Sequence, residues 1–145
     1  MANTQLAPYL NFNGNCEEAM NFYKGVFGGK LDISRFKDFG APMPEGKENG
    51  VMHATLDNGT FSFMASDGMP DRAVVVGDNV HLSLAGDDEA TLRKYFEDLS
   101  AGGKVDMPLD KQMWGDVFGM LTDKYGFHWM VNITMPGSMT DKPAE

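Results

Sequence analysis

Disulfide bonds, membrane-spanning segments and clustered cations are all missing from this sequence. Cys16 is the only cysteine in 145 residues, so no disulfide can form within the chain and stability must come from packing. No apolar run approaches the roughly 20 residues that a membrane span needs. Lys and Arg number 12 against 21 Asp and Glu, a net charge of −9, which disfavours nucleic acid as a partner. The sequence therefore predicts neither a membrane nor a nucleic-acid partner.

The N-terminus also lacks the marks of a secretory signal. Met1-Ala-Asn-Thr-Gln has neither a basic start nor an apolar stretch, so we expect a cytoplasmic protein. Methionine, in contrast, is abundant, with 12 residues. Methionine fills irregular gaps in cores and also suits adaptable binding surfaces. For most of these residues we expect loose packing in the core.

The most informative feature present is a unit that occurs twice. One copy runs over residues 9–30 and the other over 81–104. Each consists of a short alternating strand, a polar cap, an amphipathic helix and a final Gly-Gly-Lys. Internal repeats are decisive for fold assignment, and two copies are too few for a solenoid. The pattern predicts a pseudo-symmetric fold.

The first half predicts a strand at 6–13 and then a helix. Asn15 is in position to cap this helix, with Glu18 three residues later as in a capping box. Gly28-Gly29 ends it. The helix has one apolar stripe, formed by Cys16, Ala19, Met20, Tyr23, Val26 and Phe27.

Three further strands complete this half, at about 31–36, 51–56 and 61–65. The last two flank Asp57-Asn-Gly-Thr60, and an Asn-Gly between two apolar runs predicts a hairpin with a type I′ turn.

The second half repeats this order. A strand at 80–85 precedes a helix capped by Asp87 or Asp88, and strands follow near Val105, at 114–122 and at 127–133. The sequence thus predicts an α+β protein of two β-α-β-β-β modules, at 5–67 and 79–134. Together they form a single domain over 1–134, followed by a flexible tail at 135–145.

Alternation along the first strand of each module separates two sheet faces. Leu10 and Phe12 in one strand, and the apolar residues at 80, 82 and 84 in the other, are expected to lie under the helix. The opposite face carries Tyr9, Asn11, His81 and Ser83. Polar and aromatic side chains away from a helix suggest a concave, partly wet surface.

Three features of the sequence are similar to a known family. They are the paired modules, the opening Pro8-Tyr-Leu-Asn-Phe-Asn-Gly-Asn-Cys-Glu-Glu-Ala19, and the ending Trp114-Gly-Asp-Val-Phe-Gly119 … Thr122-Asp-Lys-Tyr-Gly-Phe-His-Trp129. They resemble the PhnB-like branch of the vicinal oxygen chelate superfamily, which includes glyoxalase I, extradiol dioxygenases, and fosfomycin- and bleomycin-resistance proteins. The resemblance covers about residues 5–134. It implies two half-barrels forming a cup, a homodimer and a small organic ligand. One fold hosts many reactions, so the chemistry must be argued from the site.

In metal-dependent members, the resemblance implies a divalent ion held by the first and last strands of each module. Those positions fall here on Ala7 or Pro8, Phe63 or Met64, His81, and Met130. Thioether sulfur is a soft ligand that suits Mg²⁺, Mn²⁺ or Zn²⁺ poorly. We therefore expect no ordinary metal site and no other cofactor, since no Gly-x-Gly-x-x-Gly turn follows a strand.

Several residues are candidates for a ligand site, each with a structural alternative. His81 is a general base, the remnant of a ligand set, or a hydrogen-bonded histidine at the cup wall. His53 and His128 share strand faces with other candidates, so three histidines could form an atypical metal site or serve separate structural roles. The ligand candidates are Tyr9, Asn11, His53, Phe63, Ser83, Trp114, Phe118 and Met130. Among these, Trp114 and Phe118 form an aromatic wall or belong to the core.

We expect a small-molecule-binding protein whose status as an enzyme is open. If it is an enzyme, a lyase, isomerase or group-transfer reaction with His81 as acid/base fits best, with Tyr9 and Asn11 orienting the ligand. The alternatives are a non-catalytic ligand-sequestering protein, as in drug resistance, and a metal-dependent glyoxalase-type enzyme with unusual ligands.

Overall fold

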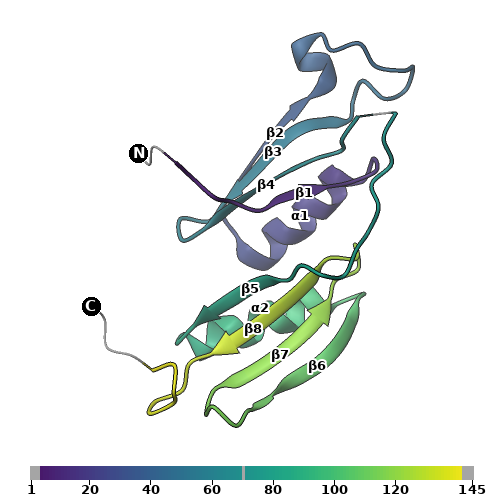
Figure 1. Cartoon of the computed structure of the whole chain (residues 1–145). Coiled ribbons are helices and arrows are strands. Elements are labelled where there is room, and N and C mark those ends of the chain that lie inside the picture. Colours follow the sequence, from purple (N-terminus) through teal and green to yellow (C-terminus); the bar gives the residue numbers. More distant parts are fainter. Residues whose placement is uncertain (1–3, 70, 142–145) are drawn as a thin grey trace. The chain divides into compact units, whose positions relative to one another are not determined.

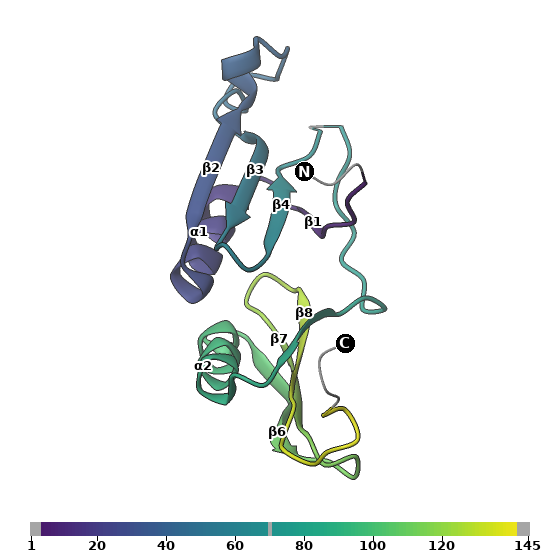
Figure 2. The same ribbon diagram turned by 90° about the vertical axis from the view of Figure 1, so that its left-hand side faces the viewer.

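The computed structural model describes residues 4–69 and 71–141, which form two compact units. The first unit comprises residues 1–75 and the second residues 76–145. Each is a four-stranded sheet with one long helix against one face (Figures 1 and 2). No helix within the described ranges is long and apolar enough to cross a bilayer.

The first unit has the predicted β-α-β-β-β order. Its elements are β1 (Tyr9–Asn11), α1 (Cys16–Phe27), β2 (Lys30–Arg35), the short 3₁₀ helix η1 (Phe36–Phe39), β3 (Val51–Asp57) and β4 (Ser62–Ser66). The strand order in the sheet is β1-β4-β3-β2, with β1 parallel to β4 and the other pairs antiparallel. The two ends of the module thus meet in the sheet, because its first and last strands are neighbours.

The second unit repeats this topology. Its elements are β5 (Leu82–Gly86), α2 (Glu89–Ser100), β6 (Lys104–Lys111), β7 (Val117–Thr122) and β8 (His128–Ile133). The strand order is β5-β8-β7-β6, again with the first and last strands parallel. The predicted fold of two β-α-β-β-β modules is confirmed.

The helices bury the stripes that the 3.6-residue period predicts. In α1 the buried residues are the six expected from the sequence. In α2, Leu92, Phe96 and Leu99 are buried and Tyr95 is half-buried. The sheets meet them with alternate residues, for example Trp129, Val131 and Ile133 of β8. One face of each sheet is therefore core, and the other is left for side chains that do not contact the helix.

The repeated Gly-Gly-Lys motif has a packing reason as well as a helix-ending one. A Cβ atom on Gly29 would lie 2.4 Å from the carbonyl oxygen of Asp57, and one on Gly103 would lie 2.3 Å from that of Thr122. Asp57 is the last residue of β3 and Thr122 is the last residue of β7, so each carbonyl stands at the end of a strand. The same close approach of backbone to backbone requires glycine in both units.

Two local predictions were wrong. The turn between β3 and β4 is a four-residue loop, not type I′, because no non-glycine residue in the described part of the chain has a positive φ. The Asn58 side-chain oxygen instead accepts from the N–H groups of Thr60 and Phe61, each at 3.0 Å. Asn15 makes no side-chain cap to α1. Asp67, which follows β4, accepts from the N–H groups of Gly14 and Cys16 in its place.

The second helix cap follows the sequence pattern. Asp88, one of the two predicted residues, accepts from the N–H of Thr91 at 3.2 Å. The part of the expected tail that is described, residues 135–141, makes hydrogen bonds to the second unit. The N–H of Met135 donates to Asp116, and that of Met139 donates to the carbonyl of Trp114.

Candidate functional site

The candidate residues lie mainly on the sheet faces that point away from the helices. We call these the open face of each sheet. In the first sheet, the open face includes Tyr9, Asn11, His53, Thr55 and Met64. In the second it includes Ser83, Phe118, Met120, Thr122, His128, Met130 and Asn132, which are exposed or half-buried and alternate with buried residues. The alternation predicted from the sequence thus separates the two faces within the strands. The placement of Val80 under the helix was wrong, because Val80 precedes β5 and is exposed.

On the open face of the first sheet, His53 is held from both sides. Its Nδ1 is 3.1 Å from the hydroxyl of Tyr9, and its Nε2 is 3.2 Å from Oγ1 of Thr55. The Tyr9 and His53 ring centroids are 5.7 Å apart. Both imidazole nitrogens are within hydrogen-bond distance of a hydroxyl group, so His53 offers a ligand no uncommitted nitrogen. Asn11, two residues after Tyr9 in β1, is exposed.

The open face of the second sheet places two histidines together. The ring centroids of His81 and His128 are 5.5 Å apart, with planes inclined at 42°. His128 Nδ1 is 3.0 Å from Oγ1 of Thr122, and its Nε2 is 3.2 Å from the carbonyl oxygen of Gly77. The Thr122 hydroxyl in turn donates to Asp106 at 2.7 Å.

Both ring nitrogens of His128 are occupied. A carbonyl oxygen only accepts, so Nε2 donates its proton to Gly77, and Nδ1 lies against the Thr122 hydroxyl. His81 is exposed, and within the described residues its ring nitrogens have no hydrogen-bond partner.

Methionines form a row across the same face. In the ladder, Met130 is opposite both Ser83 and Met120, and Met120 is opposite Met107. Directly opposite residues share a face, with Cβ atoms about 5 Å apart. Met130 and Met120 are half-buried and Met107 is exposed. The expectation that most methionines belong to the core was wrong, since Met20 alone among the methionines of the described chain is fully buried.

An aromatic pair stands at the opposite end of this face from the histidines. The rings of Trp114 and Phe118 meet edge to face at a centroid distance of 5.8 Å. The indole N–H of Trp114 donates to the side-chain oxygen of Asn132 at 3.3 Å. The amide nitrogen of Asn132 donates to Asp116, which is fully buried. Asp116 thus sets the orientation of the amide that holds Trp114.

Burial and hydrogen bonding shift the pKa of Asp116 in opposite directions. Burial alone would raise its pKa, but hydrogen bonds from Asn132, Ser138, Thr140 and the N–H of Met135 outweigh it and hold the pKa below its usual range. The carboxylate therefore stays charged and ties residues 135–140 to the start of β7.

Two candidate residues lie away from the open faces. Phe63 is buried under α1, where its ring meets Tyr23 edge to face at 5.7 Å, so it belongs to the core and we do not include it in the ligand face. Cys16 is fully buried in the first turn of α1. Its pKa is raised to about 12 by burial, with the charges of Asp67 and Glu17 adding to the effect. Its thiol is therefore inert.

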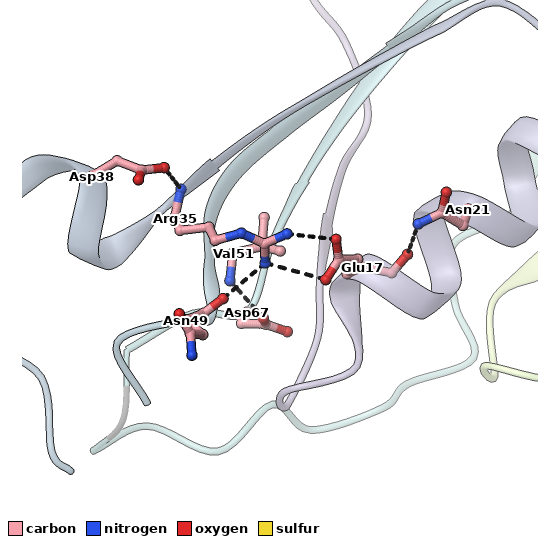
Figure 3. Close-up of polar contacts among 7 residues, drawn as sticks. All are labelled: Glu17, Asn21, Arg35, Asp38, Asn49, Val51 and Asp67. Carbon is pink, nitrogen blue, oxygen red and sulfur yellow. Dashed lines mark hydrogen bonds and ion pairs between the residues drawn. The ribbon is translucent and has the colours of Figure 1, made fainter. Parts of the chain in front are cut away.

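A polar network at the start of α1 is structural (Figure 3). Arg35 of β2 binds Glu17 through both guanidinium nitrogens, at 2.6 and 3.2 Å, and also donates to the carbonyl of Asn49. The hydrogen bond and charge of Arg35 lower the pKa of Glu17. Asp67 accepts from the N–H of Val51 at 2.8 Å in the same region. These bonds join α1 to β2 and to the loop after η1.

The donor set does not fit the divalent metal that the resemblance implies. Of the positions carried over, Met64 and Met130 offer thioethers, Phe63 is buried, and only His81 offers an imidazole. No group of three His, Cys, Asp or Glu side chains within the described ranges is arranged to hold a metal ion. Soft thioethers and one imidazole suit hard cations poorly.

The sequence analysis missed Thr122, Met120 and Asp106. Alternation from Phe118 to Thr122 would have placed Met120 and Thr122 on the face of Met130, because β7 and β8 are antiparallel neighbours. Asp106 had no such signal, since the pairing of β6 with β7 shifts register between Val105 and Met107.

Comparison with known proteins agrees with the observed fold. The family model of the Glyoxalase/Bleomycin resistance protein/Dioxygenase superfamily matches residues 5–131. Protein YjdN of Escherichia coli K12 is 31% identical over 140 residues, covering 88% of this chain and 94% of its own.

Two solved structures are similar over most of their length. PA1353 from Pseudomonas aeruginosa is 40% identical with a TM-score of 0.80, over 90% of this chain and 98% of its own. A Bacillus cereus protein described as a putative 3-demethylubiquinone-9 3-methyltransferase, PhnB protein, is 30% identical with a TM-score of 0.72, over 90% of this chain and all of its own.

Proposed function

The chain belongs to the Glyoxalase/Bleomycin resistance protein/Dioxygenase superfamily, and from that premise we propose that it binds a small organic molecule on the open face of the second sheet. His81 is the acid/base of a lyase, isomerase or group-transfer reaction on that molecule. The observation that supports this assignment is the exposed imidazole of His81 beside His128, whose own nitrogens are occupied. A general base needs a nitrogen that no other group of the protein occupies, and no hydrogen bond engages His81 in the described part of the chain.

The other candidate residues have supporting roles in this proposal. Ser83 and Met130 contact the ligand beside His81, and Trp114 and Phe118 bound it at the far end. Tyr9, Asn11 and His53 belong to the open face of the first sheet, which we propose as a separate ligand face where Tyr9 offers a hydroxyl and Asn11 an amide. We further propose a cytoplasmic homodimer.

Methyl transfer, which appears in the name of the Bacillus cereus relative, is not part of the proposal. Methyl donors of the nucleoside type are commonly held by a glycine-rich turn between a strand and a helix. Gly28-Gly29 and Gly102-Gly103 instead lie after a helix and before a strand.

Nuclear magnetic resonance with a library of small acids, amides and heteroaromatic compounds tests the proposal. We expect some members to shift the signals of His81, Ser83 and Met130. His81→Ala is then expected to abolish any conversion while leaving the shifts at Trp114 in place. Shifts confined to the helix side of the sheets, or none from any compound, would contradict the proposal.

A non-catalytic sequestering protein is the second candidate. The edge-to-face pair of Trp114 and Phe118, with the indole only half-buried, supports it because such pairs stack on flat ligands. Ligands that bind but remain unchanged, with affinity lost in Trp114→Ala and retained in His81→Ala, would favour this reading. Stoichiometric divalent metal in the purified protein would instead favour the third, metal-dependent alternative.

A further inference from the structure

We infer that the ligand of the second unit is an amphipathic carboxylate, with its acid group at His81 and His128 and an apolar body along the methionine row toward Trp114. This inference rests on the proposed function, since it names the ligand class of the same face. Three successive rows of the open face carry it, and each has a different chemistry.

The first row is ionisable. His128 lies opposite Thr122, and Thr122 lies opposite Lys104 in the ladder. Lys104 and Asp106 are 3.7 Å apart and offset one another's charge. The two imidazoles beside this neutralised pair bring no negative charge, and the N–H group of the exposed His81 ring, which has no hydrogen-bond partner among the described residues, is available as a donor. An anionic headgroup is complementary to such a donor.

The second row is apolar and adaptable. Two residues farther along β8, Met130 and its cross-strand neighbours Met120 and Met107 replace the ionisable groups. Unbranched thioether side chains adjust to irregular apolar shapes and contact aromatic rings favourably. A row of such side chains on a sheet face outside the core suits an alkyl or aryl body better than a sugar or a nucleotide.

The third row ends the face with aromatic rings. Asn132 and Phe118 lie opposite one another, and Trp114 is fixed above them by its bond to Asn132. From His128 to Asn132 the strand advances four residues, about 13 Å at roughly 3.3 Å per residue. A carboxylate with a chain of medium length, or with one or two rings, spans this distance.

The net charge of the whole chain is −9, which favours cationic ligands at long range. The charge of the headgroup is therefore the most decisive property to test. Octanoate, octan-1-ol and octylammonium share one chain and differ only in the head. Binding is measured by calorimetry and by tryptophan fluorescence, with acetate as the headgroup without a body. We expect octanoate to bind about tenfold more tightly than octanol, and octylammonium and acetate to bind more weakly still.

Variants separate the two parts of the ligand. His81→Gln is expected to lower the affinity for octanoate about tenfold toward that for octanol, and to leave octanol unchanged. Met120→Gln is expected to weaken octanoate and octanol alike. Met113→Gln is the matched control, because Met113 is 98% exposed and outside the row. It should alter neither.

Each outcome decides the inference. Octylammonium binding as tightly as octanoate, or octanoate unaffected by His81→Gln, overturns the assignment of an anionic head. Equal effects of Met120→Gln and Met113→Gln overturn the assignment of the body. If octanoate fails to bind while other library compounds shift the open-face signals, the ligand class is wrong and the proposed function stands. If no compound shifts them, both are wrong.

Discussion

Gly29 and Gly25 of the first unit differ in the space around them. Comparing them tests whether the Gly-Gly-Lys motif needs glycine because of the close approach of two backbone segments. Gly29 has a φ of 97° and no room for a Cβ beside the carbonyl of Asp57. Gly25 lies inside α1, is exposed, and has no atom within 4 Å of an added Cβ. A methyl group is therefore excluded at one site and free at the other.

We expect Gly29→Ala to lower the free energy of unfolding by more than about 1 kcal/mol, because strain at positive φ adds to the clash. Gly25→Ala should raise it by about 0.5–1 kcal/mol, since alanine favours the helix interior. Urea unfolding followed by circular dichroism measures both. Equal effects of the two substitutions would contradict the assigned contact at Gly29.

For a single residue, the sequence predicts on which face of the sheet its side chain lies but not its hydrogen-bond partner. Period-two alternation puts Tyr9 and Ser83 on the faces away from the helices, as observed. It says nothing of the bond from Tyr9 to His53, a residue 44 positions away. Partners at that separation depend on strand register, which the alternation alone leaves open.

At the scale of an element, the cap of α1 comes from a distant part of the chain. Asp67 accepts from the N–H groups of Gly14 and Cys16 at 3.0 and 2.9 Å, and from that of Val51 at 2.8 Å. One carboxylate thereby satisfies donors from the start of α1 and from β3. Asn15, the residue next to the helix, satisfies none with its side chain.

Asp67→Ala is expected to cost about 2–3 kcal/mol of unfolding free energy, because three backbone donors lose their acceptor. Asn15→Ala is its matched control and should stay within about 0.5 kcal/mol. Chemical unfolding of both variants provides the comparison. A larger loss in Asn15→Ala than in Asp67→Ala would show that the local residue is the real cap.

The helices themselves are predictable and their caps only in part, for a physical reason. The stripe of α1 depends on a period of 3.6 residues and on glycines at its end, both of which are local. Its cap depends on β4 returning beside β1, which is a tertiary event. For α2 the cap is Asp88, adjacent in sequence, and there the local pattern includes the correct residue.

In the second unit, the lowered pKa of Asp116 makes the free energy of unfolding depend on pH. Its hydrogen bonds hold the folded-state pKa below the ordinary value of 3.8, so the carboxylate stabilises the fold above about pH 4 and the contribution is lost as pH falls through the folded pKa. Asp116→Asn should be much less stable than the natural chain at pH 7. The difference should shrink at pH 2, because the Asp116 carboxyl of the unfolded chain is then protonated while the folded state still holds it charged.

Urea midpoints at pH 7 and pH 2 measure this difference, and subtraction removes the effect of other carboxylates. Asp110→Asn, at an exposed position of β6, is the control and should show little difference at either pH. An Asp116→Asn difference that grows on acidification would refute the assigned direction.

At the scale of the whole molecule, the repeat predicts the fold and leaves the chemistry open. Two units with the same strand order follow from two copies of one sequence pattern. The open faces of the units then differ residue by residue. His53 is bonded on both nitrogens in one unit, whereas in the other His81 stands beside His128 with no hydrogen bond to residues 4–69 or 71–141. Duplication preserved the apolar pattern, which the core requires, and not the polar residues of the faces.

The segment joining the two units exposes apolar side chains, and this bears on the proposed homodimer. Val75, Val76 and Val80 are 90%, 67% and 70% exposed. Clustered exposed apolar residues favour burial against another chain. Light scattering after gel filtration should therefore give twice the 15.9 kDa of one chain, and a Val75→Asp/Val76→Asp double variant should shift the mass toward one chain. Met113→Asp, equally exposed but elsewhere, should remain dimeric. A natural chain that elutes at the single-chain mass would remove the homodimer from the proposal.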